Sequence, residues 1–294
     1  MALYKYVPIE TLKRILGGTI RLTQPGAFND PFEMLPEIHV PPDFARRQVS
    51  LSFSVTAPRR PYSGAVSTVP ADDFVSRDLV AQLNRAIGVF CMSRNPSSLT
   101  MWAHYADEYR GALIEFDDTH DFFKGAVEIE YCRTRPVREF QAYLDARMPI
   151  PVSEFCHKAE EWAYENEVRV IRCLADCKVV GDGDTKGFPI YVMDLPLDCI
   201  KSVTLGERSL VEHQRVILDV LAPTSVSLNL AAVAHSGYEF RTETIKFAKP
   251  LSEVGPMISP RTAHIFRDRS DDLGEAARWA IDNHPLSALV SKKV

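Results

Sequence analysis

The chain has 294 residues, of which 46% are hydrophobic and 25% charged, the composition of an ordinary globular protein that can bury a substantial core. A formal net charge of -5 gives no bulk attraction to phosphate backbones, although a local basic site remains compatible with it. No run approaches the roughly 18 apolar residues of a spanning helix, and residues 1–8 lack a secretion signal core. We therefore expect a cytoplasmic protein without membrane association, with its six scattered cysteines reduced.

The first forty residues predict a strand, a helix, a second strand and a loop. Residues 3–6 form a short aromatic strand, residues 9–16 place their apolar side chains on one helical face, and residues 20–22 alternate as a strand. Residues 25–32 are interpreted as a loop, in which Asn-Asp-Pro favours side-chain-to-backbone turns. Residues 36–73 are rich in Pro, Ser and Arg and are interpreted as an extended excursion.

From residue 73 onward, predicted helices alternate with predicted strands. The helices are expected at 73–87, 97–106, 139–145, 153–164 and 210–221, and the strands at 88–93, 111–116, 126–131, 167–172, 188–193 and 200–205. This mixture predicts an α+β domain built around one or two twisted sheets. Prolines after Lys249 suggest a boundary, giving a domain over 1–249 and a C-terminal extension over 250–294 with a docking helix at 273–281.

Two stretches resemble ligand motifs only by their letters. Gly181 to Gly187 is followed by a strand, whereas a phosphate loop must lead into a helix, so a hairpin turn is predicted. A calcium loop starting there would end on Met193 where a glutamate is needed. Cys156-His157 with Cys173 and Cys177 lacks the paired spacing of a zinc site, and we expect no metal.

The segment 162–171 places two carboxylates directly before an apolar run. In a strand, alternate side chains share a face, so Glu165, Glu167 and Arg169 would lie opposite Val168 and Val170. A carboxylate fixed on a rigid strand suits general-base work or binding of a sugar hydroxyl. The alternative is a solvated edge strand in which Arg169 pairs with the two carboxylates.

Trp102, His104 and Tyr105 fall within one helical turn and could stack and orient a planar ligand. The alternative is that both large rings belong to the core while the imidazole is a spectator. Asn29 and Asp30 also have two interpretations: they could form the rim of a pocket, or they could simply cap a turn.

Four motifs in this order resemble a widespread bacterial family of unknown function, whose members are often found among phage-defence and abortive-infection genes. The motifs are Leu3-Tyr4-Lys5-Tyr6, Phe28-Asn29-Asp30-Pro31-Phe32, Met101-Trp102-Ala103-His104-Tyr105-Ala106 and Trp162-Ala163-Tyr164-Glu165-Asn166-Glu167-Val168-Arg169. The resemblance covers roughly residues 1–245, including Val203-Thr204-Leu205-Gly206, and leaves the tail outside.

More distantly, the opening resembles ADP-ribosyltransferases of the DNA-targeting toxin and RNA-phosphotransferase type, which implies twisted mixed or antiparallel sheets with flanking helices. In that resemblance, Lys5 stands where the first-strand histidine would be, Tyr105 or Trp102 where the nicotinamide-stacking ring would be, and Glu167 at the catalytic glutamate. Lys5 is a departure, because a lysine can donate to a ribose hydroxyl or pyrophosphate but cannot alternate donor and acceptor as imidazole does.

The resemblance implies NAD as the cofactor and ADP-ribosyl transfer to a macromolecule, a protein or a nucleic acid, by a toxin or phage-defence effector. Glu167 would stabilise the positive charge that develops as nicotinamide leaves, and Glu165 would activate the accepting group. The cofactor-binding candidates are Lys5, Tyr6, Asn29, Asp30, Trp102, His104 and Tyr105.

Two other functions fit the same residues. One is a non-catalytic nucleotide- or protein-binding module of a defence system, which would recognise a partner protein without turnover. The other is a nuclease or hydrolase that holds a magnesium ion with Asp30, Glu165 and Glu167.

Overall fold

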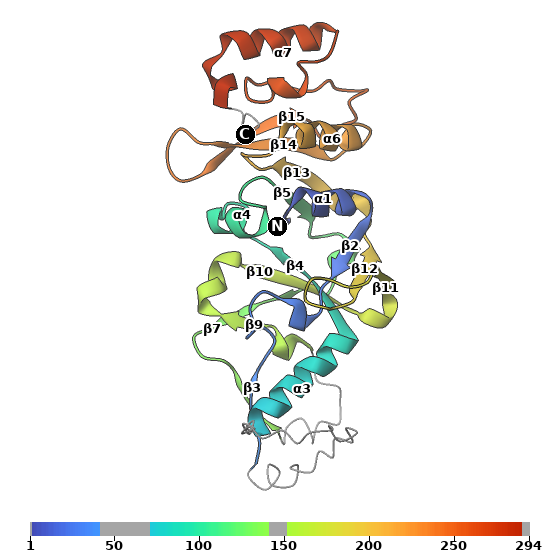
Figure 1. Cartoon of the computed structure of the whole chain (residues 1–294), viewed down its shortest axis with the longest axis vertical. Helices are drawn as coiled ribbons and strands as arrows, with labels where there is room; N and C mark the ends of the chain where they lie inside the picture. Colours follow the sequence, from blue (N-terminus) through green and yellow to red (C-terminus); the bar gives the residue numbers. More distant parts are fainter. Residues whose placement is uncertain (1, 42–70, 141–151, 290–294) are drawn as a thin grey trace, which may run out of the picture.

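Eight strands form the main sheet of the protein. Figure 1 shows the computed structural model, in which this sheet runs through the middle of the molecule. They are β1 (Ala2–Val7), β4 (Ile87–Ser93), β5 (Ala112–Asp117), β6 (Val127–Glu128), β10 (Glu167–Cys173), β13 (Ile200–Leu205), β14 (Ser227–Val233) and β15 (Phe240–Lys246). Their order across the sheet is β15-β14-β13-β5-β1-β4-β10-β6, with β13 and β14 parallel and the other neighbours antiparallel. The structure describes residues 2–41, 71–140 and 152–289, and within them the expected α+β class with a mixed sheet is confirmed.

Three smaller sheets flank the main one. β2 (Thr19–Leu22), β11 (Lys178–Val180) and β12 (Ile190–Asp194) form an antiparallel sheet in the order β11-β12-β2. The hairpin turn predicted at 181–187 is confirmed, because Val180 pairs with Ile190 across it. The parallel pairs join β3 (Glu37–His39) to β8 (Val137–Glu139) and β7 (Glu130–Cys132) to β9 (His157–Ala159).

The helices are amphipathic and cover the sheets. They are α1 (Ile9–Leu16), α3 (Ala71–Ala86), α4 (Leu99–Tyr105), α6 (Val211–Leu221) and α7 (Asp272–Asn283), close to five of the predicted ranges. The i, i+3, i+4 spacing of α1 buries one apolar face against the core. Ser98 caps α4 by accepting the amide hydrogen of Met101. Among the helices in the described ranges, none is long and apolar enough to cross a bilayer.

One predicted helix, over 153–164, is wrong. The chain there forms a short 3-10 helix at Val152–Phe155, then β9, then the 3-10 helix η4 (Glu160–Glu165). Pairing of β9 with β7 overrides the local helical pattern. For the helix predicted at 139–145, Glu139 instead ends β8, and residues 141–145 lie outside the described residues.

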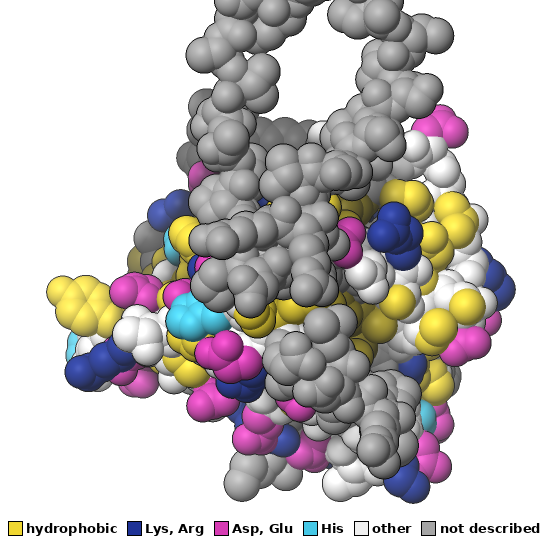
Figure 2. Space-filling view, turned by 90° about the horizontal axis from the view of Figure 1, so that it is seen from below, with side chains coloured by type: hydrophobic (Ala, Val, Ile, Leu, Met, Phe, Trp, Pro, Cys, Tyr) yellow, Lys and Arg dark blue, Asp and Glu magenta, His cyan; other side chains and the backbone are white. Residues whose placement is uncertain are grey.

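The excursion predicted over 36–73 is described only at its two ends. Residues 37–39 form β3 and residue 71 begins α3, while 42–70 lie outside the described residues. α3 and β3 lie at one end of the elongated molecule (Figure 1). On that end, lysine and arginine side chains lie among aspartates and glutamates, so its described surface presents mixed charge (Figure 2).

The C-terminal segment packs beside α6, at the opposite end from α3 (Figure 1). Arg215 of α6 donates from Nε to the carbonyl of Ile265 at 2.8 Å and from Nη2 to that of His264 at 2.7 Å. Ala277 and Ala280 of α7 are buried in the same apolar cluster as the main sheet. The segment after residue 249 is therefore packed against the rest of the chain.

Candidate functional site

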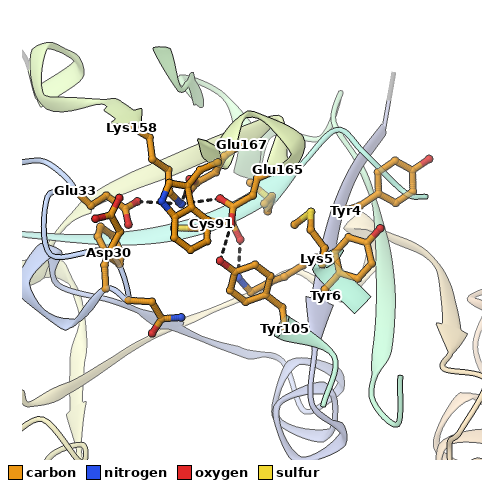
Figure 3. Close-up of a pocket in the computed structure, with 15 residues that line it drawn as sticks. Tyr4, Lys5, Tyr6, Asp30, Glu33, Cys91, Tyr105, Lys158, Glu165 and Glu167 are labelled. Carbon is orange, nitrogen blue, oxygen red and sulfur yellow. Dashed lines mark hydrogen bonds and ion pairs between the residues drawn. The ribbon is translucent and has the colours of Figure 1, made fainter. Parts of the chain in front are cut away.

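A cavity of about 160 Å³ lies where β1, β4, α4, β9, η4, β10 and the loop at 28–33 converge. Figure 3 shows its side chains, in which carboxylates and lysines from distant parts of the sequence point toward one another. Of the residues singled out from the sequence, seven line the cavity: Lys5, Tyr6, Asn29, Asp30, Tyr105, Glu165 and Glu167. Trp102 and His104 do not line it.

Strand β10 fixes the position of Glu167. In its pairing with β4, Glu167 lies opposite Ser93 and Arg169 opposite Cys91, so Glu167 and Arg169 share a face while Val168 and Val170 are buried on the other. The alternative is wrong in making this a solvated edge strand, although the pairing of Arg169 with Glu167 that it included is observed. β10 runs between β4 and β6, and Glu167 is 6% exposed while Arg169 is fully buried.

Glu165 reaches the cavity by another route than predicted. It is the last residue of η4 and not part of the strand, and Asn166 after it adopts a left-handed conformation with φ 43°. That turn redirects the chain into β10, so the two carboxylates converge without strand alternation. The Ser93 hydroxyl holds the turn by donating to the Glu165 carbonyl at 2.5 Å.

Lys158 joins the buried carboxylates into one ionic network (Figure 3). Its Nζ lies 2.6 Å from Glu165 Oε2, 3.3 Å from Glu167 Oε2 and 3.7 Å from Glu33 Oε1. Arg169 donates two hydrogen bonds to Glu167, from Nε to Oε1 at 2.8 Å and from Nη2 to Oε2 at 3.0 Å. It also pairs with Glu33. All five side chains are buried, so the charges act on one another with little screening by water.

Burial sets the protonation of this network. Desolvation raises the pKa of Glu167 despite the opposing charge of Lys158. Desolvation works to lower the pKa of Lys158, but the charges of Glu167 and Glu165 outweigh it, and the pKa is raised. Burial lowers the pKa of Arg169 to about 9. At neutral pH both cations stay protonated, so the carboxylates remain held by charge-assisted hydrogen bonds.

Two aromatic rings line the cavity. The Tyr105 hydroxyl donates to Glu165 Oε1 at 2.6 Å. The pKa of this phenol is raised mainly by burial and further by the nearby Glu165 carboxylate. Trp162 of η4 lies with its ring centroid 4.9 Å from Lys158 Nζ. The Tyr105 hydroxyl thus orients Glu165 at one wall, while the Trp162 ring forms another.

Trp102 is a core residue, as the alternative interpretation had it. It is 2% exposed and contacts Tyr6 edge-to-face, with ring centroids 5.3 Å apart, and Phe240 at 6.1 Å. His104 is exposed on the outer face of α4. Helical spacing explains both positions, since Met101 and Tyr105, four residues apart, face the cavity.

Lys5 and the loop at 28–33 complete the cavity walls. Lys5 Nζ donates to the Cys91 carbonyl at 2.5 Å and lies 4.5 Å from the Phe90 ring centroid, and burial lowers its pKa. Asp30 accepts the amide hydrogen of Phe32 at 2.9 Å, so the capped-turn interpretation holds while Asn29 and Asp30 also line the cavity.

The site candidates chosen from the sequence omit several residues that line the cavity, among them Glu33, Cys91, Lys158 and Trp162. Trp162 begins one recognised motif and Glu33 directly follows another, but neither side chain was chosen as a candidate. Lys158 lies in the segment that was predicted to be helical, and only the pairing of β9 with β7 brings it to the carboxylates.

The network also bears on a metal site. Within the described residues, no group of three or more His, Cys, Asp or Glu side chains could hold a metal ion. Between Glu165 and Glu167 lies the ammonium group of Lys158. That cation takes the place a magnesium ion would need in order to bridge these carboxylates, which argues against the nuclease alternative.

Comparison of the chain with known protein families, with curated proteins and with solved structures gives no match.

Proposed function

We propose that the protein is an NAD-dependent ADP-ribosyltransferase-like effector of phage defence, which acts in the cytoplasm on a macromolecular target and binds the nicotinamide-ribose end of NAD in this cavity. The observation that carries the proposal is the convergence of Lys5, Tyr105, Glu165 and Glu167 on one buried pocket. The opening of the fold, β1 then α1 then Gly17 and β2, supports it, because it follows the strand-helix-strand order expected from the resemblance.

The charge balance of the site favours a cationic ligand. Four carboxylates, Asp30, Glu33, Glu165 and Glu167, face three cations, Lys5, Lys158 and Arg169. With all of these groups ionised, the site carries one net negative charge. In a desolvated pocket such a charge attracts a cation strongly. The oxidised nicotinamide ring is a planar cation, and Tyr105 and Trp162 supply aromatic walls for it.

Glu165 keeps free acceptor positions that could act on a substrate. An ionised carboxylate offers about four acceptor positions, and Glu165 uses one on each oxygen, for Tyr105 and Lys158. As the bond between ribose and nicotinamide breaks, nicotinamide leaves with the electron pair and positive charge develops on the ribose. Glu167 stabilises that charge, and Glu165 accepts the proton of the attacking group on the target.

The test is nicotinamide release and transfer of labelled ADP-ribose from NAD into a bacterial lysate. We expect the wild-type protein to do both and Glu167→Gln to be slower by about 100-fold or more, the usual loss when one preorganised electrostatic contact is removed. Glu161→Gln is the matched control, because Glu161 is exposed in the same segment, and it should behave as wild type. Equal release by wild type and Glu167→Gln, with circular dichroism showing both folded, would refute the proposal.

One observation favours a second candidate, a non-catalytic nucleotide-binding module. Lys158 and Arg169 already neutralise both glutamates, which suits ligand recognition without turnover. A thermal-shift series with NAD, ADP-ribose and nicotinamide separates the two, because a ligand of the folded state raises the melting temperature. A shift with NAD but no nicotinamide release in any lysate would establish the module.

A further inference from the structure

A second cavity, of about 620 Å³, lies between the main sheet and the β11-β12-β2 sheet. β1 and β4 pair where Tyr4 lies opposite Ser93, and further along, β4 turns to β2 through a bridge between Val89 and Thr23. The second cavity lies beside the place where β4 leaves β1 and approaches β2. Its volume is that of a typical small-molecule site.

The second cavity has apolar walls and a basic charge. The apolar lining includes Ile15, Phe90, Val180, Ile190 and Val192, and the charged lining consists of Lys5, Arg14 and Arg21. Among the described residues that line it there is no aspartate or glutamate. An apolar wall with several cations and no acid complements a ligand with an apolar body and one anionic group.

Arg21 supplies a specific anchor in the second cavity. It lies opposite Val192 in the β2–β12 pair, so strand alternation puts Thr19 and Thr23 on its face. Its Nη2 pairs with Asp184, but its Nε is buried and has no hydrogen-bond partner in the described structure. A buried donor without an acceptor costs free energy that a ligand oxygen would recover.

Arg14 of α1 extends the basic side of the second cavity. It is exposed, and no ion pair of its side chain is found among the described residues. The two guanidinium groups therefore border the apolar chamber from different elements, α1 and β2.

We propose that the second cavity binds a medium-chain carboxylate, with the alkyl chain along the β12 wall and the carboxylate held by Arg21 and Arg14. A guanidinium binds a carboxylate through two parallel hydrogen bonds, and Arg21 Nε offers one of the donors. The apolar strand residues then shield the chain from water, which supplies most of the affinity. This site is separate from the carboxylate network around Lys158, although Lys5, Phe28 and Cys91 line both cavities.

The experiment is isothermal titration of the full chain with dodecanoate, compared with dodecanol as the neutral molecule of equal chain length. We expect saturable one-to-one binding of dodecanoate, and binding of dodecanol weaker by about tenfold, the loss of a hydrogen bond to a charged group. This comparison uses only the wild-type protein, so it does not depend on how any variant folds.

Three variants locate the binding. Arg21→Gln should weaken dodecanoate by about tenfold and leave dodecanol unchanged, while Val192→Trp should abolish binding of both by filling the chamber. Lys178→Gln is the matched control, since Lys178 is an exposed cation of the same small sheet, paired with Asp194, and should change nothing. Absence of saturable dodecanoate binding, equal affinity for both molecules, or an equal effect of Arg21→Gln and Lys178→Gln would overturn the proposal.

Discussion

Replacing Lys158 by methionine should destabilise the protein strongly, because this one ammonium group neutralises three buried carboxylates. Lys158 is 7% exposed, and its Nζ lies within 4 Å of Glu33, Glu165 and Glu167. Methionine keeps most of the chain volume but removes the charge. Of its side-chain partners among the described residues, Glu165 then keeps the Tyr105 hydroxyl, whereas Glu167 and Glu33 retain Arg169.

The magnitude follows from the burial of Glu165. Removing one partner of a buried ion pair costs about 3–5 kcal/mol, since the other charge is left without compensation. We therefore expect Lys158→Met to lower the free energy of unfolding at pH 7 by about 3–5 kcal/mol, measured by urea denaturation. The matched control is Lys178→Met on β11, which breaks an exposed pair with Asp194 and should cost at most about 1 kcal/mol.

The pH dependence of the loss identifies its cause. Burial already raises the pKa of Glu167 and the charge of Lys158 opposes that rise, so Lys158→Met should raise the pKa of Glu167 further above its value in the unfolded chain. A group that binds its proton more tightly when folded adds stability as the pH falls, so the deficit of Lys158→Met relative to wild type should shrink from pH 7 to pH 5. A loss below about 1 kcal/mol at pH 7, or a deficit that does not change with pH, would refute the reasoning.

Two further predictions concern strain and thiol reactivity. Glu108 has φ 51° in a run of three left-handed residues with Asp107 and Tyr109, and Glu108→Gly should stabilise the fold by up to about 1 kcal/mol in thermal unfolding, because glycine adopts this conformation without a Cβ clash; a lowered melting temperature would contradict this. Burial raises the pKa of Cys91 well above its usual value, so iodoacetamide at pH 8 should label exposed Cys173 at least about tenfold faster, as measured by peptide mass spectrometry. Equal labelling of the two thiols in the native protein would contradict that order, whereas equal labelling in denaturant is expected.

Local sequence patterns predicted the elements whose periodicity is strong. The helix of residues 9–16 and the strand of residues 167–172 follow directly from the positions of their apolar side chains. The helix predicted over 153–164 is wrong because its apolar residues fit a helix only weakly. Pairing of β9 with β7 decided the structure of this segment. Pairing partners 25 or more residues away are not encoded in the local period.

The candidate site was predictable only in part for the same reason. Glu167 was found because it begins a clear strand, and Tyr105 because it shares a turn with other rings. Which ring of that turn faces the cavity depends on how α4 lies on β1, and Trp102 turned out to face the core. Lys158 carries no pattern of its own, yet it holds the network together.

The energetics of this network argue that stability alone does not account for it. Each buried ion carries a desolvation cost of several kcal/mol, and apolar side chains of similar volume commonly serve a core equally well or better. Glu33, Lys158, Glu165 and Glu167 nevertheless line a cavity instead of filling it, and Arg169 pairs with two of them. Lys158 and Glu167 have displaced pKa values and border this open space, a combination that is typical of sites that act on a ligand. The buried charges thus lower the stability of the fold, and they lie where a bound cation would contact them.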